Sequence, residues 1–363
     1  MKHIISTLGS HSALDVSEGA KQEGFKSLVV CQLGREYTYL GPYKTRKRGT
    51  KEVGVVDEVL LLGKFSEICS EQTISYLKKK NAIFVPNRSF AVYVGYDAIE
   101  NKFPIPIFGN RKLLRAEERD VPNNQFDLLR KAGIPYPKEI SSPEKIDRLV
   151  VVKVNEAKRK YERAFFLAST YEEYKEKSGK LLKTGKITEA DLKKARIEEF
   201  IIGAHFNFNF FVSPMYGDLE LLGVDMRRQT TLDGYLRMPA DVQLEALKTR
   251  EPRNIEVGHV ACTVRESLIQ DVYQQAEKFV ATVEKEYAPG IIGPFALQGA
   301  IEERDGKEQF TTFDVSFRMP GSPGTRFTPY SGYLFRESVS FGRRIAMEVK
   351  EAERKKKMDL ITT

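Results

Sequence analysis

The stretch Ile291–Thr325, IIGPFALQGAIEERDGKEQFTTFDVSFRMPGSPGT, has the pattern of two antiparallel strands joined by a tight turn. Asp305 and Gly306 supply the turn, because both residue types favour the backbone conformations that a hairpin turn needs. Gln298 and Asp314 are almost equally distant from Gly306, so folding the hairpin sets their side chains nearly opposite one another. Such a pair of oxygen ligands can hold Mg²⁺, which usually takes only one or two ligands from the protein at a nucleotide site.

Apolar residues alternate along both halves of this stretch with a period of two, which is typical of strands with one buried face. An alternative interpretation is a hairpin with one solvated face, in which Gln298 and Asp314 simply face water. The spacing alone leaves both interpretations open. The alternation assigns the following residues to the buried face: Phe295, Leu297, Gly299, Ile301, Thr311, Phe313, Val315 and Phe317.

The composition is that of a globular chain. With 363 residues, 41% of them hydrophobic and 30% charged, the chain can bury a large core and should form roughly two or three domains. No apolar run is long enough to span a bilayer, and Met1–Thr7 has the pattern of a strand, so we expect a cytoplasmic protein without a membrane partner. Cys31, Cys69 and Cys262 are far apart and form no CxxC, so neither disulfides nor a zinc site is expected.

The net charge of +8 predicts attraction to anions, which include nucleic acid, membrane surfaces and phosphorylated small molecules. Basic residues gather in short runs such as Lys78–Lys80 and Arg354–Lys357, which have the pattern of solvated helix ends. These runs contain no interleaved aromatic residues, and the chain has no RNA-module signature, so nucleic acid is not an expected partner.

Residues 1–120 have the pattern of a doubly wound α/β domain. A short apolar strand, His3–Leu8, precedes a helix and a second strand, Leu28–Cys31, so the first loop lies at the carboxyl end of a strand, where open sheets bind ligands. His11 lies in this loop and has no helix-capping role. Further buried strands are predicted at 55–62, 82–86 and 105–109, and polar clusters that could converge on one ligand follow the strands at 10–12, 87–90 and 108–111.

Residues 121–204 and 205–363 are predicted to form a second and a third domain. In the second, an apolar strand ends at Lys153 and is followed by a basic loop, and a later strand covers 196–202. In the third, the strand 205–212 places a histidine and two asparagines on one face and phenylalanines on the other. This alternation favours a face that lines a polar pocket over a solvated sheet.

The order of these parts resembles that of the ATP-grasp fold, in which a nucleotide lies between two α+β lobes. There, a strand lysine and a flexible loop hold the phosphates, and acidic or amide side chains on late strands carry magnesium. More narrowly, the chain resembles the PurP family of archaeal formate-dependent ligases of purine synthesis. The resemblance rests on short sequence motifs that occur in the same order along nearly the whole chain: SHSAL, EGAKQEGF, VPNRSF, IPIFGNRKLLR, AGIPYPK, VVVK, IEEFIIG, ELLGVDMRR, DGYLRMPA, VRESL, GPFALQG and FGRRIAMEVKEA.

The resemblance implies an ATP-dependent carbon–nitrogen ligase. ATP would phosphorylate formate to formyl phosphate, and the amine of phosphoribosyl aminoimidazole carboxamide would attack it, giving a formamide, ADP and phosphate. The resemblance also implies magnesium, or manganese in its place, and a homo-oligomer. The implied site residues are His11, Ser89 and His259 for the ribotide, Lys153, Lys158 and Lys160 for the phosphates, Glu198, Glu199, Phe200 and Ile201 for the adenine, and Gln298 and Asp314 for the metal.

Several positions depart from the family pattern. The family's phosphate loop is rich in glycine, whereas residues 156–165 contain none. Glycine lets backbone N–H groups approach phosphate closely, and Lys158 or Lys160 would replace this with less geometric control. His259 stands where the family has asparagine, and Asp314 where it has glutamate. The missing glycines favour weakened or lost ATP binding.

These departures leave three alternatives open. The first is the formate-dependent ligase itself. The second is a divergent paralogue that joins a carboxylate to an amine on another phosphorylated substrate. The third is a non-catalytic protein that binds a nucleotide or ribotide and acts with a true ligase. ATP binding separates the third alternative from the others, and formate dependence separates the first from the second.

Overall fold

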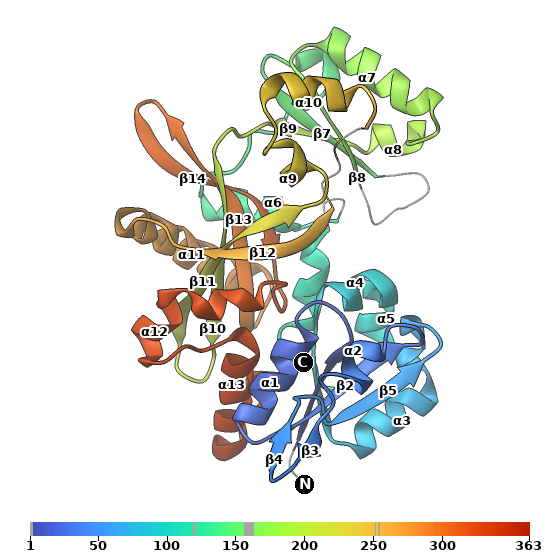
Figure 1. Ribbon diagram of the computed structural model, residues 1–363. Helices are drawn as coiled ribbons and strands as arrows, with labels where there is room; N and C mark the ends of the chain where they lie inside the picture. The colour runs from blue at the N-terminus through green and yellow to red at the C-terminus, as the bar shows by residue number, and fades with distance from the viewer. Residues whose placement is uncertain (1–2, 119–120, 156–162, 251, 253–254) are drawn as a thin grey trace.

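The computed structural model describes residues 3–118, 121–155, 163–250, 252 and 255–363. A parallel sheet, a three-stranded sheet and a five-stranded sheet form its framework, with one short two-stranded ribbon in addition. Figure 1 shows the N-terminal α/β part at one end, the five-stranded sheet in the middle, and the three-stranded sheet with its helices at the other end. The predicted loop residues Lys158 and Lys160 lie outside the described residues.

The first sheet is parallel and has the strand order β5-β2-β1-β6, as expected for a doubly wound domain. The strand predicted at 105–109 is reduced to a bridge between Phe84 and Ile107, because Pro104 and Pro106 have no N–H to donate. The elements of this part are β1 (Ile4–Leu8), α1 (Ala13–Gln22), β2 (Lys26–Gln32), α2 (Tyr37–Leu40), β3 (Arg46–Arg48), β4 (Lys51–Val53), β5 (Glu58–Leu62), η1 (Phe65–Cys69), α3 (Glu71–Lys79), β6 (Ala82–Val85), α4 (Arg88–Val94), α5 (Tyr96–Asn101) and η2 (Arg111–Glu117).

The second sheet is antiparallel, with the order β8-β7-β9, and its helices pack on a small apolar core of their own. The helix before it ends at Gly133, whose φ of 62° is the left-handed conformation that glycine adopts readily. The strand predicted at 196–202 ends at Glu199, so Phe200 and Ile201 follow it. The elements are α6 (Gln125–Ala132), η3 (Pro143–Lys145), β7 (Val150–Asn155), β8 (Arg163–Ala168), α7 (Tyr171–Lys183), α8 (Glu189–Lys193) and β9 (Arg196–Glu199).

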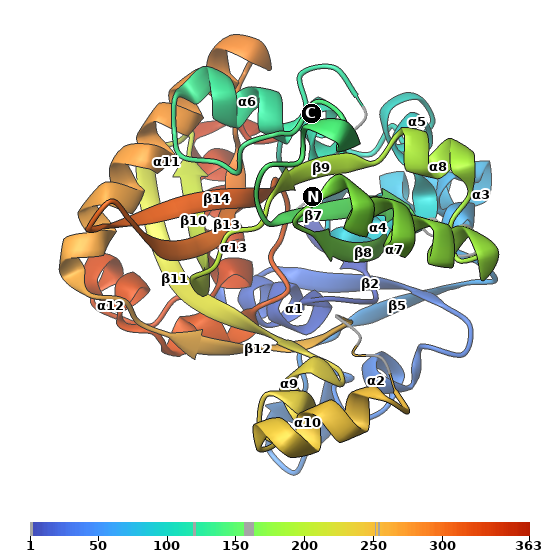
Figure 2. The same ribbon diagram turned by 90° about the horizontal axis from the view of Figure 1, so that it is seen from above.

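The third sheet is antiparallel, with the order β12-β11-β10-β13-β14, and its last two strands form the predicted hairpin. One face packs with α11 and α6 on the largest apolar core, and the opposite face carries polar side chains. Figure 2 shows α9 and α10 projecting beyond β12, away from this core. The elements are β10 (Ala204–Ser213), β11 (Asp218–Gln229), α9 (Leu232–Tyr235), α10 (Ala240–Leu247), β12 (Glu256–Cys262), α11 (Glu266–Glu286), β13 (Gly293–Arg304), β14 (Lys307–Ser316), η4 (Pro323–Phe327), α12 (Pro329–Phe335), α13 (Phe341–Lys355) and η5 (Met358–Leu360).

The hairpin contains a bulge that corrects the predicted face of two residues. Gln298 pairs with Asp314, but the next residue, Gly299, pairs with Thr312, so Phe313 is an extra residue in β14. An extra residue shifts the alternation by one. Phe310 therefore takes the core position predicted for its neighbour Thr311, and Thr311 and Phe313 leave the core face.

The last long helix ties the two ends of the chain together. α13 packs on α1 so closely that a side chain at Gly19 would lie 2.1 Å from the backbone nitrogen of Arg343. This contact crosses the predicted domain limits at 120 and 204, and those limits stay a prediction. No helix in the described part of the chain is long and apolar enough to cross a membrane.

Candidate functional site

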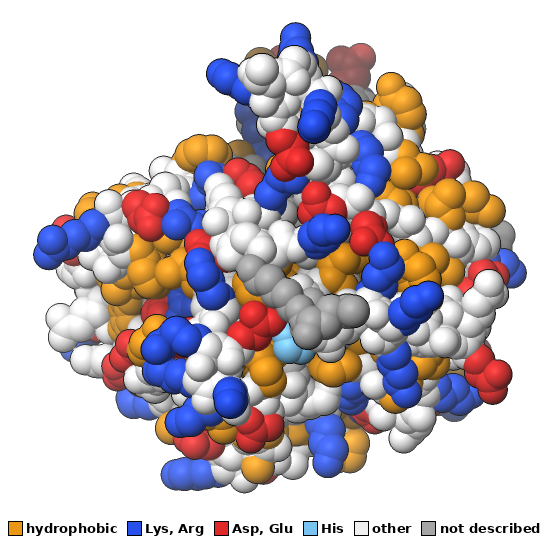
Figure 3. Space-filling model, turned by 90° about the horizontal axis from the view of Figure 1, so that it is seen from below, with side chains coloured by type: hydrophobic (Ala, Val, Ile, Leu, Met, Phe, Trp, Pro, Cys, Tyr) orange, Lys and Arg blue, Asp and Glu red, His pale blue; other side chains and the backbone are white. Residues whose placement is uncertain are grey.

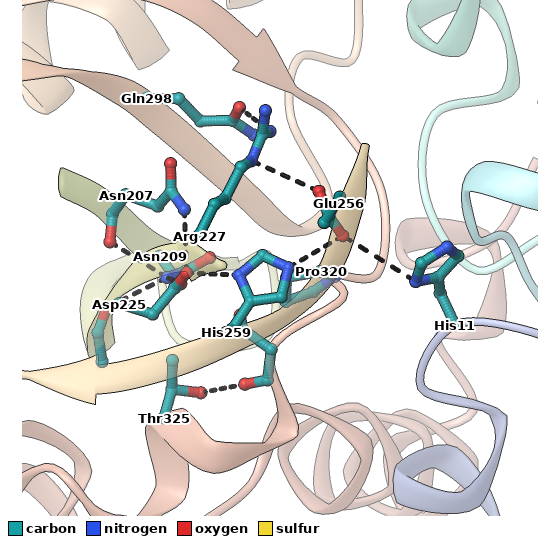
Figure 4. Close-up of polar contacts among 12 residues, drawn as sticks. His11, Asn207, Asn209, Asp225, Arg227, Glu256, His259, Gln298, Pro320 and Thr325 are labelled. Atoms are coloured by element: carbon teal, nitrogen blue, oxygen red, sulfur yellow. Dashed lines mark hydrogen bonds and ion pairs between the residues drawn. The ribbon is translucent and has the colours of Figure 1, made fainter. Parts of the chain in front are cut away.

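Loops from distant parts of the chain meet beside the five-stranded sheet (Figure 4). Ser12, in the loop after β1, donates a hydrogen bond of 2.5 Å to the carbonyl oxygen of Pro320, in the loop after β14. His11 Nδ1 lies 3.9 Å from Glu256 Oε1, and His259 Nε2 lies 2.9 Å from the same oxygen. The two histidines predicted to contact a substrate are thus brought together on one carboxylate.

His259 lies between two carboxylates. Its Nδ1 is 2.5 Å from Asp225 Oδ2, and its Nε2 faces Glu256. Asp225 is buried and also accepts hydrogen bonds from Asn207 Nδ2 at 2.8 Å and Asn209 Nδ2 at 2.7 Å. The two asparagines are buried, so this part of the predicted polar face is enclosed, whereas His205, which was predicted on the same face, is exposed. Because an acceptor faces each ring nitrogen, His259 donates from both and carries a positive charge.

The electrostatics of the site agree with this geometry. Burial opposes the charge on His259, but hydrogen bonds to Asp225 and Glu256 raise its pKa to about 9. Burial likewise opposes the charge on Glu256, but His259, Arg227 and His11 lower its pKa to about 2. Burial, together with nearby cationic groups, lowers the pKa of His11. At neutral pH, an imidazolium–carboxylate pair therefore faces a mainly neutral imidazole.

Gln298 and Asp314 are directly paired across β13 and β14, as the sequence predicts. Directly opposed residues point to the same face of a sheet. Gln298 Oε1 accepts a hydrogen bond from Arg227, whose Nε lies 3.3 Å from Glu256 Oε2. Arg227 therefore connects the predicted metal pair to the cluster around His259 (Figure 4).

The Gln298 and Asp314 pair fits a magnesium ion in its donor atoms. An amide oxygen and a carboxylate are hard ligands, and the register places both on one face. The described residues contain no group of three or more histidine, cysteine, aspartate or glutamate side chains arranged for a metal, so the remaining ligands would come from water and phosphate oxygens. The guanidinium of Arg227 would have to share or release the Gln298 oxygen.

Lys153 and Glu198, two of the predicted nucleotide contacts, form an ion pair between β7 and β9. Their side chains are 9% and 1% exposed, and Arg196 Nε also lies 2.8 Å from Glu198. Glu198 is therefore enclosed and holds the lysine in place. The predicted contact of Lys153 with a phosphate stays a prediction, and Glu198 is too deeply buried to lie on the surface of the predicted adenine site.

Glu199, Phe200 and Ile201 lie where the three-stranded sheet approaches the hairpin. Glu199 Oε1 is 3.3 Å from Nη2 of Arg304, at the end of β13. The backbone N–H of Phe200 donates to the carbonyl oxygen of Leu149 at 3.0 Å, and Ile201 is buried. The segment thus links the two sheets, and its predicted contact with adenine stays a prediction.

Ser89 lies at the start of α4, in the N-terminal part of the molecule. Its hydroxyl donates to Ser10 Oγ at 2.6 Å, next to His11 in the same loop. Asn87 Nδ2 donates to the carbonyl oxygen of Leu8 at 2.9 Å, so the end of β6 holds the end of β1. The predicted ribotide contacts His11 and Ser89 therefore belong to one structural unit at the carboxyl edge of the parallel sheet.

Sequence reasoning missed several charged residues of the site. Asp225 and Glu256 flank His259, and Glu117, Arg88 and Arg318 lie between the N-terminal part and β14. One usable signal was present, because Asp225 lies two residues before Arg227 and so shares its face of a strand. The sequence contains no comparable signal for Glu256, because its position opposite Gln229 depends on the register shift between β11 and β12.

Other solved structures share this fold. The ADP complex of N5-carboxyaminoimidazole ribonucleotide synthetase superposes with a TM-score of 0.57 over 89% of this chain and 71% of that chain, at 13% identity, which shows the fold alone. Two family models match, described as "Protein of unknown function (DUF1246)" over residues 5–140 and "Domain of unknown function (DUF1297)" over residues 173–363. The fold is that of an ATP-grasp protein.

Two similar proteins narrow this class. The 5-formaminoimidazole-4-carboxamide-1-(beta)-D-ribofuranosyl 5'-monophosphate synthetase of Methanopyrus kandleri is 41% identical over 360 residues, covering 99% of this chain and 94% of that protein. The crystal structure of an IMP biosynthesis protein PurP from Thermococcus kodakaraensis matches with a TM-score of 0.73 and 30% identity, over 99% of this chain and 100% of that chain. The chain belongs to the PurP family of ATP-grasp ligases.

Proposed function

We propose that this protein is the ATP-dependent ligase that formylates phosphoribosyl aminoimidazole carboxamide with formate, in the synthesis of IMP. The similarity to the Methanopyrus kandleri synthetase extends over 99% of the chain, so it includes both the lobes and the site between them. The observation that carries the proposal in this structure is the meeting of the predicted ribotide contact His11, the Glu256–His259 pair and the Gln298–Asp314 pair on one side of the five-stranded sheet.

The reaction divides into two steps. In the first, a formate oxygen attacks the terminal phosphorus of ATP, a new oxygen–phosphorus bond forms, and the bond to ADP breaks. In the second, the ribotide amine attacks the carbon of formyl phosphate, phosphate leaves with the electron pair of the carbon–oxygen bond, and the amine loses one proton. Formyl phosphate is hydrolysed by water, so closing the lobes over the site would protect it.

The residues fit these steps in position and charge. Lys153, held by Glu198, can pair with a phosphate of ATP from the three-stranded sheet. Gln298 and Asp314 would hold magnesium, which offsets the charge of the phosphates during phosphoryl transfer. Both nitrogens of His259 face carboxylates, so its role in ribotide binding is to hold the Glu256 carboxylate next to His11.

The test is product formation from the complete set of substrates. The purified protein is incubated with ATP, Mg²⁺, ¹³C-formate and the ribotide, and the products are identified by mass spectrometry. We expect a formamide that is heavier by the labelled formyl group, with one ADP per product, and no product when any component is omitted. ATP turnover without formate would favour the divergent paralogue, and absence of ATP turnover would favour the non-catalytic alternative.

The metal assignment has its own test. Asp314→Ala removes the only charged member of the predicted pair, so calorimetric titration should show weaker Mg-ATP binding than in the wild-type protein, by about tenfold or more. Equal affinity of both proteins for Mg-ATP would show that Asp314 does not hold the metal. ADP titrated without metal is the control, because its binding should be the same in both proteins.

We further propose a homo-oligomer, and the support comes from exposed apolar side chains. α10 contains apolar side chains but buries none of them. Leu244 on this helix is 66% exposed, and Leu236, before the helix, is 69% exposed. Such an apolar helix on a projecting arm is typical of a contact with another subunit.

Figure 3 shows basic and acidic side chains interspersed over the face that it views, which gives no support there for a nucleic-acid partner. The expected cytoplasmic location stays a prediction.

A further inference from the structure

The loop that carries His11 is held in one conformation from two sides. Ser12, the next residue, has a φ of 61°, in the left-handed region that residues other than glycine rarely adopt. Its hydroxyl donates to the carbonyl oxygen of Pro320 at 2.5 Å, and Asn87 Nδ2 donates to the carbonyl oxygen of His11 at 3.4 Å. An unfavourable backbone conformation persists only where the surrounding structure enforces it, and such residues are frequent at functional sites. The protein itself therefore fixes the backbone of His11.

The ring of His11 has one nitrogen beside a carboxylate and the other open. Its Nδ1 lies 3.9 Å from Glu256 Oε1, a distance that becomes an ion pair when the ring is protonated. Its Nε2 points away from Glu256 (Figure 4) and makes no hydrogen bond to any other residue that the structure describes. The side chain is 45% exposed, so a substrate can reach it. A histidine that has a carboxylate at one nitrogen and an open second nitrogen can accept a proton from a substrate.

Glu256 is held in place beside His11. His259 Nε2 lies 2.9 Å from its Oε1, and Arg227 Nε lies 3.3 Å from its Oε2. The loop after β14 passes within contact distance of the same groups, since a Cβ at Gly321 would lie 3.4 Å from each of Glu256 Oε1, His11 Nδ1 and His259 Nε2. Glu256 therefore keeps both its position and its charge, and it can stabilise a protonated His11.

The charges around His11 favour a neutral ring that can still take up a proton. Burial lowers the pKa of His11 and Glu256 raises it, while three further cationic groups lower it. These cations come from three segments: Arg318 after β14, His259 on β12 and Arg88 at the start of α4. A general base has to be neutral before it acts, and its protonated form needs a counter-charge afterwards. The cations supply the first condition and Glu256 supplies the second.

We propose that His11 is the general base of the second step and takes the proton that the ribotide amine loses, with Glu256 as the positioning residue that pairs with the imidazolium. This inference rests on the function proposed above. The amine forms its bond to the carbon of formyl phosphate, and phosphate leaves with the electron pair of the carbon–oxygen bond. The proton passes to Nε2 of His11, while the electron pair of the N–H bond stays on nitrogen. The imidazolium then gives its proton to water.

The test measures how much formamide forms for each ADP in His11→Gln, at saturating ribotide. The first step does not involve the amine, so this variant should still cleave ATP when formate is present, and water should hydrolyse the formyl phosphate. We expect kcat for formamide to fall about 100-fold or more, and formamide per ADP to fall well below one. His3→Gln is the matched control, because His3 pairs with Glu353 in another part of the molecule. It should keep the wild-type ratio and a kcat within about twofold.

The pH profile separates a base from a binding contact. In the wild type, kcat for formamide should rise with pH through the pKa of His11, below the ordinary value of 6.5, because only the neutral ring accepts a proton. This rise should be absent in His11→Gln. Glu256→Gln removes the charge that raises the pKa of His11, so the rise should move to lower pH and kcat should fall by about tenfold.

A His11→Gln variant with the wild-type kcat and only a higher KM for the ribotide would overturn the inference and leave His11 a binding contact. Persistence of the wild-type pH dependence in this variant would also overturn it. If circular dichroism shows that His11→Gln is unfolded, Glu256→Gln decides, and an unchanged pH profile there overturns the inference. A wild-type protein that forms no formamide would instead overturn the proposed function, and this inference with it.

Discussion

His259 has a carboxylate oxygen 2.5 Å from one ring nitrogen and another 2.9 Å from the second. The buried Asp225 fixes the ring from one side, and the ring in turn fixes Glu256 next to His11. Each group in this network supplies a hydrogen-bond donor or acceptor to its neighbour, and a buried network of this kind fixes a single arrangement of the side chains. Removing His259 would leave the carboxylate of Asp225 buried, with the amides of Asn207 and Asn209 as its remaining donors among the described residues.

We predict that His259 makes the stability of the protein depend on pH. Its folded pKa of about 9 lies above the unfolded value of 6.5, so its stabilising effect is complete below pH 6.5 and is lost as the pH rises through about 9. His259→Gln keeps a donor but cannot be charged. Urea unfolding should therefore show the wild type losing more free energy of unfolding than the variant between pH 6.5 and pH 9.

The expected difference at pH 6 is roughly 3 kcal/mol in favour of the wild type, because the variant leaves a buried carboxylate without its cation. His3→Gln is the matched control, since His3 pairs with Glu353 but lies in a different part of the molecule. Parallel stability–pH curves for wild type and His259→Gln would show that His259 is not charged in the folded protein.

At the residue scale, the site residues that lie in short motifs shared with the family could be predicted from the sequence, but the residues that pair with them could not. His11, Lys153, Gln298 and Asp314 were predicted, and the register pairs the last two as expected. Glu117 was missed although it belongs to the same site, because a buried carboxylate that anchors Arg318 has no local sequence pattern. Its role arises from a contact between residues 201 positions apart.

The β13–β14 hairpin is the element that presents the predicted metal pair. Its turn, its strands and the opposition of Gln298 and Asp314 were predictable from period and turn residues. The bulge at Phe313 was not, because an extra residue leaves the local pattern of apolar residues nearly unchanged. The consequence is that Thr311 turns to the polar face, where its hydroxyl donates to Glu302 at 2.5 Å.

We predict that Gly299→Ala destabilises this hairpin. A Cβ there would lie 2.2 Å from the carbonyl oxygen of Thr311 and 2.7 Å from the ring of Phe310, so the bulge would have to shift. Gly258→Ala is the control, since nothing lies within 4 Å of its Cβ position. Thermal unfolding should show a loss of roughly 1–3 kcal/mol for Gly299→Ala. A change no larger than that of the control would mean that the bulge relaxes freely.

The whole molecule places its site where three sheets approach one another, and the contact between α13 and α1 holds the ends of the chain together. The α/β part and the order of the lobes were predictable, because strand patterns and helix stops are local. The relative placement of the lobes was not, since contacts such as that of Asn110 Nδ2 with the carbonyl oxygen of Gly290, at 2.9 Å, join distant segments.

We predict that the exposed apolar side chains of α10 hold subunits together. Leu244→Asp places a charge where an apolar contact is expected, so light scattering after size exclusion should show a smaller particle than for the wild type. Lys248→Asp, just beyond the helix, controls for added negative charge. A monomeric wild-type protein would contradict the proposed oligomer, and a Leu244→Asp variant of unchanged size would move the interface elsewhere.

Transfer of oxygen from formate to phosphate tests the ligase reaction most directly. The purified protein is supplied with Mg-ATP, the ribotide and formate labelled with ¹⁸O in both oxygens, and the phosphate released is analysed by mass spectrometry. A formyl phosphate intermediate passes one formate oxygen to phosphate when the amine displaces it. We expect one ¹⁸O in each phosphate and the other in the formamide product. Phosphate without label, or no phosphate at all, would contradict formyl transfer by this protein.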